Sequence, residues 1–194
     1  GPDQLHIKAQ LKQQLQQRMG LAVAAERPLL GVVSRMTAQK GFDLLFQSLP
    51  PLLEARDAGL VVLGSGDRRY EDFFADLAAR WPDRVAFHGR YNEELAHWIE
   101  AGSDIFLMPS LYEPCGLNQM YSLRYGTVPV VRRTGGLADS VQHFDATTGR
   151  GTGIVFNDYD PGGLRWALAT ALEWFGWPSV WRRLVMNGMR EDFS

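Results

Sequence analysis

The chain has 194 residues, 45% of them hydrophobic, so it can bury an ordinary core and is predicted to form one domain, which could belong to a longer chain. Its 20 basic and 22 acidic residues give a net charge of −2, which argues against nucleic acid as the main partner. A single cysteine, Cys115, excludes an internal disulfide and a thiolate zinc cluster. Apolar runs of strand length exclude a membrane span, so we expect a cytoplasmic protein. The opening Gly1-Pro2, without Met, is interpreted as a remnant of cloning or cleavage.

Six short apolar segments are predicted to be strands. They are rich in Val, Ile, Leu and Phe without strict alternation, which is typical of strands covered on both faces. They comprise residues 28–33, 59–63, 84–88, 104–108, 128–131 and 153–156. The segments between them carry apolar residues at helical spacing. This alternation predicts an α/β fold, a Rossmann-like parallel sheet with helices on both faces.

Helices are predicted between and around these strands. In residues 92–101, Leu95, Trp98 and Ile99 are three and four positions apart, and Asn92 is a plausible N-cap. The same pattern predicts helices over residues 42–53, 70–81, 118–125, 163–175 and 178–194.

The first segment, residues 4–19, contains six glutamines. We expect a helix rather than a disordered tract, because Leu5, Ala9, Leu11 and Leu15 can form one apolar face.

The loop after the first strand holds two cations, Arg35 and Lys40, and Gly41 then opens the next helix. In an open parallel sheet, ligands bind beyond the carboxyl ends of the strands. Positive charge and free amides at such an end suit a diphosphate. The alternative is that both are ordinary solvated surface cations.

Two further loops at strand ends give weaker indications. Gly64 and Gly66 resemble the start of a dinucleotide fingerprint, but the third glycine position holds Arg69, so a tight turn into a helix explains them. Tyr91 follows the third strand, where its ring could stack on a nucleobase or simply pack.

The loop after the fourth strand, residues 109–119, carries the densest pattern. Glu113 is followed by Pro114, and a helix is expected to start near Leu117. The unpaired amides at that helix start suit an anion; they belong to Gly116, Leu117 and Asn118. Cys115 has no histidine near it in sequence, so we expect a contact residue and not a nucleophile.

A second glycine turn, Gly135-Gly136, follows the fifth strand and would let the backbone approach a ligand closely. Together with the previous loop it predicts two helix N-termini at one cleft. Asp158 and Asp160 resemble a metal-binding pair, but they precede Pro161 and are better explained as a turn and a helix cap. We therefore expect no metal.

Three segments, residues 34–41, 113–117 and 133–139, resemble in order and spacing the C-terminal half of bacterial glycogen synthase and plant starch synthase. The resemblance covers residues 5–194. It implies that residues 1–194 are the nucleotide-sugar-binding domain of a GT-B glycosyltransferase whose N-terminal domain lies outside this chain. The implied reaction transfers glucose from ADP-glucose to the non-reducing end of an α-1,4-glucan with retention, releases ADP and uses no cofactor.

The resemblance also implies roles for single residues. Arg35 and Lys40 would neutralise the diphosphate, Glu113 would contact the glucosyl group near the reacting centre, and Tyr91 would stack on the adenine. The remaining sugar and phosphate contacts would come from Cys115, Gly116, Leu117, Asn118, Thr134, Gly135 and Gly136. Arg, Lys and helix dipoles can stabilise a leaving diphosphate without a metal.

One position departs from the wider superfamily. Other retaining relatives often carry a second glutamate eight residues after the first, where this chain has Tyr121; this favours the glycogen and starch synthase branch. The Lys-x-Gly-Gly-Leu motif of the family's N-terminal domain does not occur in the chain. The isolated chain is therefore expected to bind nucleotide weakly and to transfer no glucose, because half a cleft excludes water poorly.

Other functions stay open at this point. One is a sucrose- or trehalose-forming GT-B transferase, and another is a non-catalytic domain that binds a glucan or a partner. A nicotinamide-binding domain is disfavoured by the missing third glycine.

Overall fold

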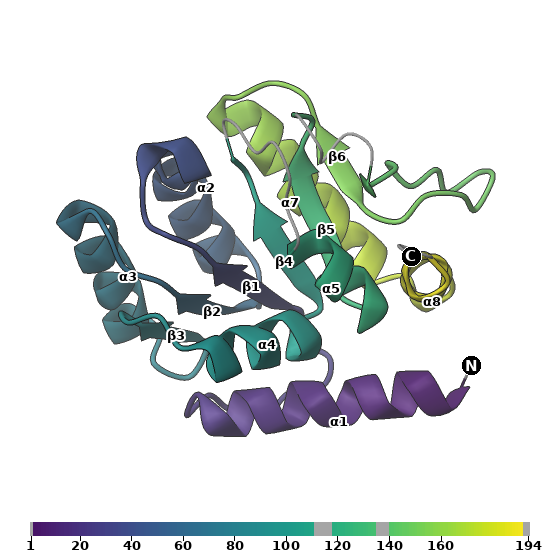
Figure 1. Cartoon of the computed structure of the whole chain (residues 1–194), viewed down its shortest axis with the longest axis horizontal. Coiled ribbons are helices and arrows are strands. Elements are labelled where there is room, and N and C mark those ends of the chain that lie inside the picture. The colour runs from purple at the N-terminus through teal and green to yellow at the C-terminus, as the bar shows by residue number, and fades with distance from the viewer. Residues whose placement is uncertain (1, 111–117, 135–139, 192–194) are drawn as a thin grey trace.

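The computed structural model describes residues 2–110, 118–134 and 140–191. It contains a six-stranded parallel sheet in the order β3-β2-β1-β4-β5-β6 (Figure 1). The strands are β1 (Leu29–Val33), β2 (Gly59–Leu63), β3 (Val85–His88), β4 (Ile105–Met108), β5 (Val128–Arg132) and β6 (Ile154–Phe156). Each strand end lies within one residue of its prediction, and the order is that of a doubly wound Rossmann sheet. The predicted fold class is confirmed.

Helices cover both faces of this sheet, as predicted. They are α1 (Pro2–Arg18), the 3₁₀ helix η1 (Ala38–Lys40), α2 (Phe42–Ala55), α3 (Arg68–Arg80), α4 (Glu93–Gly102), α5 (Asn118–Arg124), α7 (Pro161–Phe175) and α8 (Pro178–Met189). Helices α2, α3 and α7 lie on one face, and α4 and α5 lie on the other (Figure 1). Helix α1 runs beneath α4, so it adds an outer layer on that side.

The strands bury both faces because alternate residues enter two separate cores. Leu30 and Val32 of β1 belong to the core under α2, α3 and α7, whereas Leu29 belongs to the core under α4. Helix α4 contributes Leu95 to the second core, as its spacing predicts. Asn92 caps this helix, accepting a hydrogen bond from the Leu95 amide at 3.0 Å.

Two further predicted turns are confirmed as helix caps. The Asp67 side chain accepts a hydrogen bond from the Arg69 amide at 3.0 Å and begins α3. The Asp160 side chain accepts one from the Gly163 amide at 2.7 Å and begins α7, as expected for a cap.

The buried face of α1 differs from its prediction. Ala9 is exposed, and Leu5 and Leu11 are only half-buried. Apart from Leu15, the fully buried positions are polar: Lys8, Lys12 and Gln16. The predicted apolar face is therefore wrong in part, because the helix docks through side chains that combine an apolar stem with a hydrogen-bonding head.

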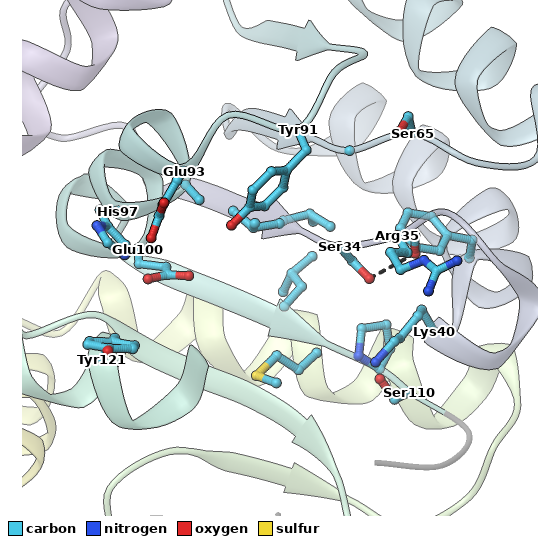
Figure 2. A pocket seen from close by; sticks show the side chains of 18 residues that line it. Ser34, Arg35, Lys40, Ser65, Tyr91, Glu93, His97, Glu100, Ser110 and Tyr121 are labelled. Carbon is cyan, nitrogen blue, oxygen red and sulfur yellow. Dashed lines mark hydrogen bonds between the residues drawn. The ribbon is translucent and has the colours of Figure 1, made fainter. Parts of the chain in front are cut away.

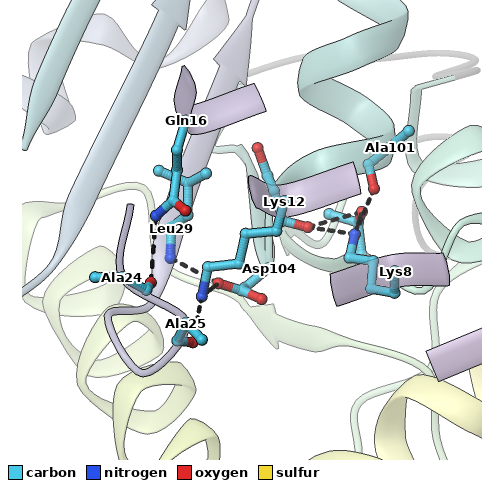
Figure 3. Close-up of polar contacts among 10 residues, drawn as sticks. Lys8, Lys12, Gln16, Ala24, Ala25, Leu29, Ala101 and Asp104 are labelled. Carbon is cyan, nitrogen blue, oxygen red and sulfur yellow. Dashed lines mark hydrogen bonds and ion pairs between the residues drawn. The ribbon is translucent and has the colours of Figure 1, made fainter. Parts of the chain in front are cut away.

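The two lysines hold α1 against the amino ends of the strands (Figure 3). Lys8 Nζ donates to the Ala101 carbonyl at 2.7 Å, in the last turn of α4, and also to Ser103 and Thr127. Lys12 Nζ lies 2.8 Å from Asp104 Oδ2. Burial lowers the pKa of Lys8 to about 7, although nearby Asp104 opposes the change.

Among the described residues, every helix is too short or too polar to span a membrane.

Candidate functional site

A cavity of about 450 Å³ opens at the carboxyl ends of β1 and β4 (Figure 2). These strands are neighbours, but β1 pairs on its other side with β2, and β4 with β5. The order of the sheet therefore reverses between them, which is where open α/β sheets bind ligands. Ser34 and Arg35 line the cavity after β1, and Pro109 and Ser110 line it after β4.

The two predicted cations line the same end of this cavity. Arg35 is exposed and Lys40 is half-buried, at the end of η1. Gly41 follows with a φ of 85°, and a Cβ at this position would collide with the carbonyl of Pro109. Only glycine fits such a backbone so close to a neighbouring strand end. Residues 34–41, which we call the cation loop, thus pack through Gly41 against Pro109. Pro109 is the first residue of the loop that is predicted to contact the sugar and phosphate.

Backbone contacts fix the cation loop to the loop after β2. The Met36 amide donates to the Ser65 carbonyl at 2.9 Å, and the Asp67 amide donates to the Met36 carbonyl at 2.9 Å. A Cβ on Gly66 would lie 2.5 Å from the Met36 carbonyl, so the close approach requires a glycine. The glycines of this turn therefore fix the backbone beside Arg35, and they do not form a dinucleotide fingerprint.

Tyr91 stands in the wall of the cavity between β3 and α4 (Figure 2). The residue is 72% exposed, so ordinary packing does not explain the position of its ring. An exposed aromatic ring beside a cavity offers a flat face to a planar group such as a nucleobase.

The cavity has an acidic end that the sequence prediction missed. Glu93, His97 and Glu100 of α4 line it, four and three positions apart on one side of the helix. Glu100 is buried, and this burial raises the pKa of its carboxyl to about 7. Tyr121 of α5 lines the cavity as well, with its ring centroid 5.9 Å from that of His97. The spacing of the polar residues along residues 92–101 carries this signal, whereas the apolar spacing predicts the helix alone.

The structure thus brings Arg35, Lys40 and Tyr91 to one cavity. Thr134 follows β5 and does not line it, and Asn118 is the first residue of α5. The other predicted site residues lie outside the described residues: Glu113, Cys115, Gly116, Leu117, Gly135 and Gly136.

A second groove, of about 490 Å³, lies between α1 and α8 at the amino edge of the sheet. Lys8 and Lys12 line it, but both ammonium groups already bind protein oxygens. Phe175 and Trp181 make much of it apolar. It therefore suits an anionic ligand less well than the cavity at the carboxyl edge. In the described ranges no three His, Cys, Asp or Glu side chains gather as a metal site.

Residues 13–174 match the family model described as glycosyl transferases group 1. The chain is 55% identical over 193 residues to the glycogen synthase of Anaeromyxobacter dehalogenans strain 2CP-C. This alignment covers 100% of the chain and 40% of that enzyme. The chain therefore spans about 40% of the length of the curated relatives it matches.

Among solved structures, the catalytic domain of starch synthase IV from Arabidopsis thaliana, bound to ADP and acarbose, matches with a TM-score of 0.87 and 36% identity. The match covers 96% of this chain and 39% of that one. Sucrose-phosphate synthase from Thermosynechococcus elongatus matches with a TM-score of 0.69 at 22% identity, covering 93% of this chain and 44% of that one. At that identity the likeness establishes the fold alone.

Proposed function

Because the chain belongs to the group 1 glycosyltransferases, we propose that it is the nucleotide-sugar-binding half of a glycogen synthase. The whole enzyme would transfer glucose from ADP-glucose to the non-reducing end of an α-1,4-glucan, with retention at the anomeric carbon. The observation that carries this proposal is the cavity between β1 and β4, where Arg35, Lys40 and Tyr91 meet.

The cation loop would bind the diphosphate. A guanidinium and an ammonium beside one cavity suit phosphate oxygens, and the Arg35 fork can bind two of them at once. During transfer, the bond between the glucosyl carbon and the diphosphate breaks and negative charge grows on the leaving ADP. An acceptor hydroxyl oxygen bonds to the same carbon, and its proton passes to the leaving diphosphate. Arg35 and Lys40 would stabilise that charge without a metal or any other cofactor.

The nucleoside would lie toward Tyr91, whose exposed ring would stack on the base. The starch synthase relative is bound to ADP, which supports ADP-glucose as the donor here. Its acarbose supports an α-glucan acceptor. The sucrose-phosphate synthase shares the fold only, so it does not favour a small sugar as acceptor.

The glucosyl end of the donor would lie against residues outside the described part of the chain. Glu113 would contact the glucose near the reacting carbon. Further sugar and phosphate contacts would come from Cys115, Gly116, Leu117, Gly135 and Gly136 outside that part, and from Asn118 at the start of α5. Thr134 does not line the described cavity, so we assign it no contact.

The other wall of the cleft would come from an N-terminal domain, since the chain spans about 40% of its relatives' length. Without that wall, water would reach the donor. The 194-residue chain is thus expected to bind ADP and to transfer no glucose, and the full enzyme is expected in the cytoplasm.

The test is calorimetric titration of the 194-residue chain with ADP and with UDP. We expect ADP to bind more tightly, and Arg35→Ala and Lys40→Ala each to weaken it about tenfold or more, because each removes a charge-assisted contact. Arg56→Ala is the matched control, since Arg56 is exposed and does not line the cavity. Absence of ADP binding at millimolar concentration would contradict the proposal.

A further inference from the structure

The end of the cavity away from the cations is formed by Glu100, in the last full turn of α4. Its side chain points into the cavity between α4 and α5 (Figure 2). Only 3% of the residue is exposed to solvent. The carboxyl of a residue buried to this extent normally has hydrogen-bond partners in the protein, even where its oxygens reach a cavity.

Glu100 has none for its carboxyl among the described residues. Within residues 2–110, 118–134 and 140–191, no hydrogen bond or ion pair reaches these oxygens, and burial accounts for the raised pKa. The other buried charged groups behave differently, since Lys8, Lys12 and Asp104 all contact one another or backbone oxygens. Glu100 therefore stabilises no described part of the fold through its carboxyl.

The backbone of Glu100 is nevertheless firmly held. Its carbonyl accepts a hydrogen bond from Thr127 Oγ1 at 2.6 Å, and Lys8 binds the carbonyl of the next residue, Ala101, at 2.7 Å. The end of α4 is thus fixed, and the carboxyl is presented on a rigid support, as a recognition group requires.

The charges of the cavity are separated along its length. Arg35 and Lys40 lie at one end, and Glu93 and Glu100 at the other (Figure 2). A ligand that fits this pattern has an anionic centre and neutral hydrogen-bond donors beyond it. A nucleotide sugar has this chemistry, because hydroxyl groups flank its diphosphate on both sides.

We propose that the Glu100 carboxyl accepts hydrogen bonds from hydroxyl groups of the nucleotide sugar and so determines which ligands the cavity holds. This inference rests on the proposed function. Tyr121 lies across the cavity from Glu100 (Figure 2), where its phenol can donate or accept a further hydrogen bond. The hydroxyls belong either to the ribose or to the glucosyl group, and the experiment distinguishes the two.

The experiment measures the affinity of the 194-residue chain for ADP, 2′,3′-dideoxy-ADP and ADP-glucose, for the wild type and for Glu100→Leu and Glu100→Gln. If Glu100 binds the ribose, Glu100→Leu lowers the affinity for ADP about tenfold and leaves the affinity for 2′,3′-dideoxy-ADP unchanged. If Glu100 binds the glucosyl group, the same variant lowers the affinity for ADP-glucose alone. Glu100→Gln loses less affinity, because the amide oxygen still accepts a hydrogen bond.

Two results would overturn the inference: unchanged affinity of Glu100→Leu for all three ligands, or an equal loss for ADP and its dideoxy analogue. Failure of the proposed function looks different, because the wild type would then bind no ADP. Glu94→Gln is the matched control, an exposed glutamate of α4 that pairs with Arg18 and does not line the cavity. Thermal unfolding checks that each variant is folded. Glu100→Leu should raise the midpoint, since it removes a buried carboxyl without partners.

Discussion

A pair of cations lies at each end of the parallel strands, which we call the amino edge and the carboxyl edge of the sheet. The two pairs have opposite environments. At the amino edge, Lys8 and Lys12 are buried and bind protein oxygens (Figure 3). At the carboxyl edge, Arg35 and Lys40 line a cavity (Figure 2). The first pair attaches α1 to the body of the domain, whereas the second pair is positioned to meet a ligand. In this fold, burial more than residue type separates structural charges from binding charges.

Substitution of a buried charge at the amino edge should cause the largest loss of stability. Asp104→Asn removes the charge that faces Lys12 Nζ at 2.8 Å and alters the oxygen that accepts from the Leu29 amide at 2.8 Å. A buried ammonium left without its counter-ion should cost about 3–5 kcal/mol in the free energy of unfolding, measured by urea denaturation. Asp57→Asn is the control, since this exposed carboxylate pairs with Arg27 and should cost under about 1 kcal/mol. Equal losses in the two variants would remove the contrast between paired interior and surface charges.

Glu100 should lower stability at high pH. Its pKa is raised from 4.5 to about 7 in the folded chain, so the folded state holds the proton that the unfolded chain releases between these values. Stability from this group therefore falls as pH rises through that window, by about 1–2 kcal/mol in total, because solvent in the cavity screens part of the effect. The Glu100→Gln variant should have a higher free energy of unfolding than the wild type at pH 8, and the same value at pH 4. A difference between variant and wild type that does not change with pH would contradict this.

The junction between the cation loop and β4 should not tolerate a side chain at Gly41. Gly41→Ala adds a Cβ at a φ of 85° that also collides with the Pro109 carbonyl, and should cost about 2 kcal/mol or more. Gly20→Ala isolates the backbone strain, because Gly20 has a φ of 73° with no neighbour within 4 Å of the added Cβ. It should cost about 1 kcal/mol. If chemical denaturation gave both variants the same loss, the close approach at Pro109 would be wrong.

Arg35 should contribute almost nothing to stability. Its side chain is exposed, so Arg35→Ala should change the free energy of unfolding by no more than about 0.5 kcal/mol while ADP affinity falls. Parallel denaturation and calorimetry on one preparation measure both effects. A large loss of stability would mean that Arg35 resembles Lys12 and holds the fold.

The sheet was predictable from the sequence because its strands are buried on both faces and therefore appear as continuous apolar runs. The grouping of Arg35, Lys40 and Tyr91 was predictable for a related reason, since loops at the carboxyl ends of parallel strands meet at one edge. The family resemblance predicted from three short segments is confirmed by the matches over the whole chain.

Two features escaped prediction because they depend on how a helix is rotated in the fold. The predicted apolar face of residues 4–19 did not include Lys8 and Lys12. The carbonyls that bind them come from residues about 90 positions away or from a separate loop. Glu100 lies beside Ile99, and the apolar spacing of α4 says which side enters the core without saying what the other side faces. In the folded chain, α5 and the carboxyl ends of β1 and β4 make that side a cavity wall.

The most direct test maps bound ADP on the isotopically labelled chain by amide chemical shifts. We predict shifts at Ser34, Arg35 and Ser65 and beside Tyr91, at the carboxyl edge, and none at Lys8 or Lys12. Shifts confined to the groove between α1 and α8, or no shifts at millimolar ADP, would contradict a nucleotide site between β1 and β4.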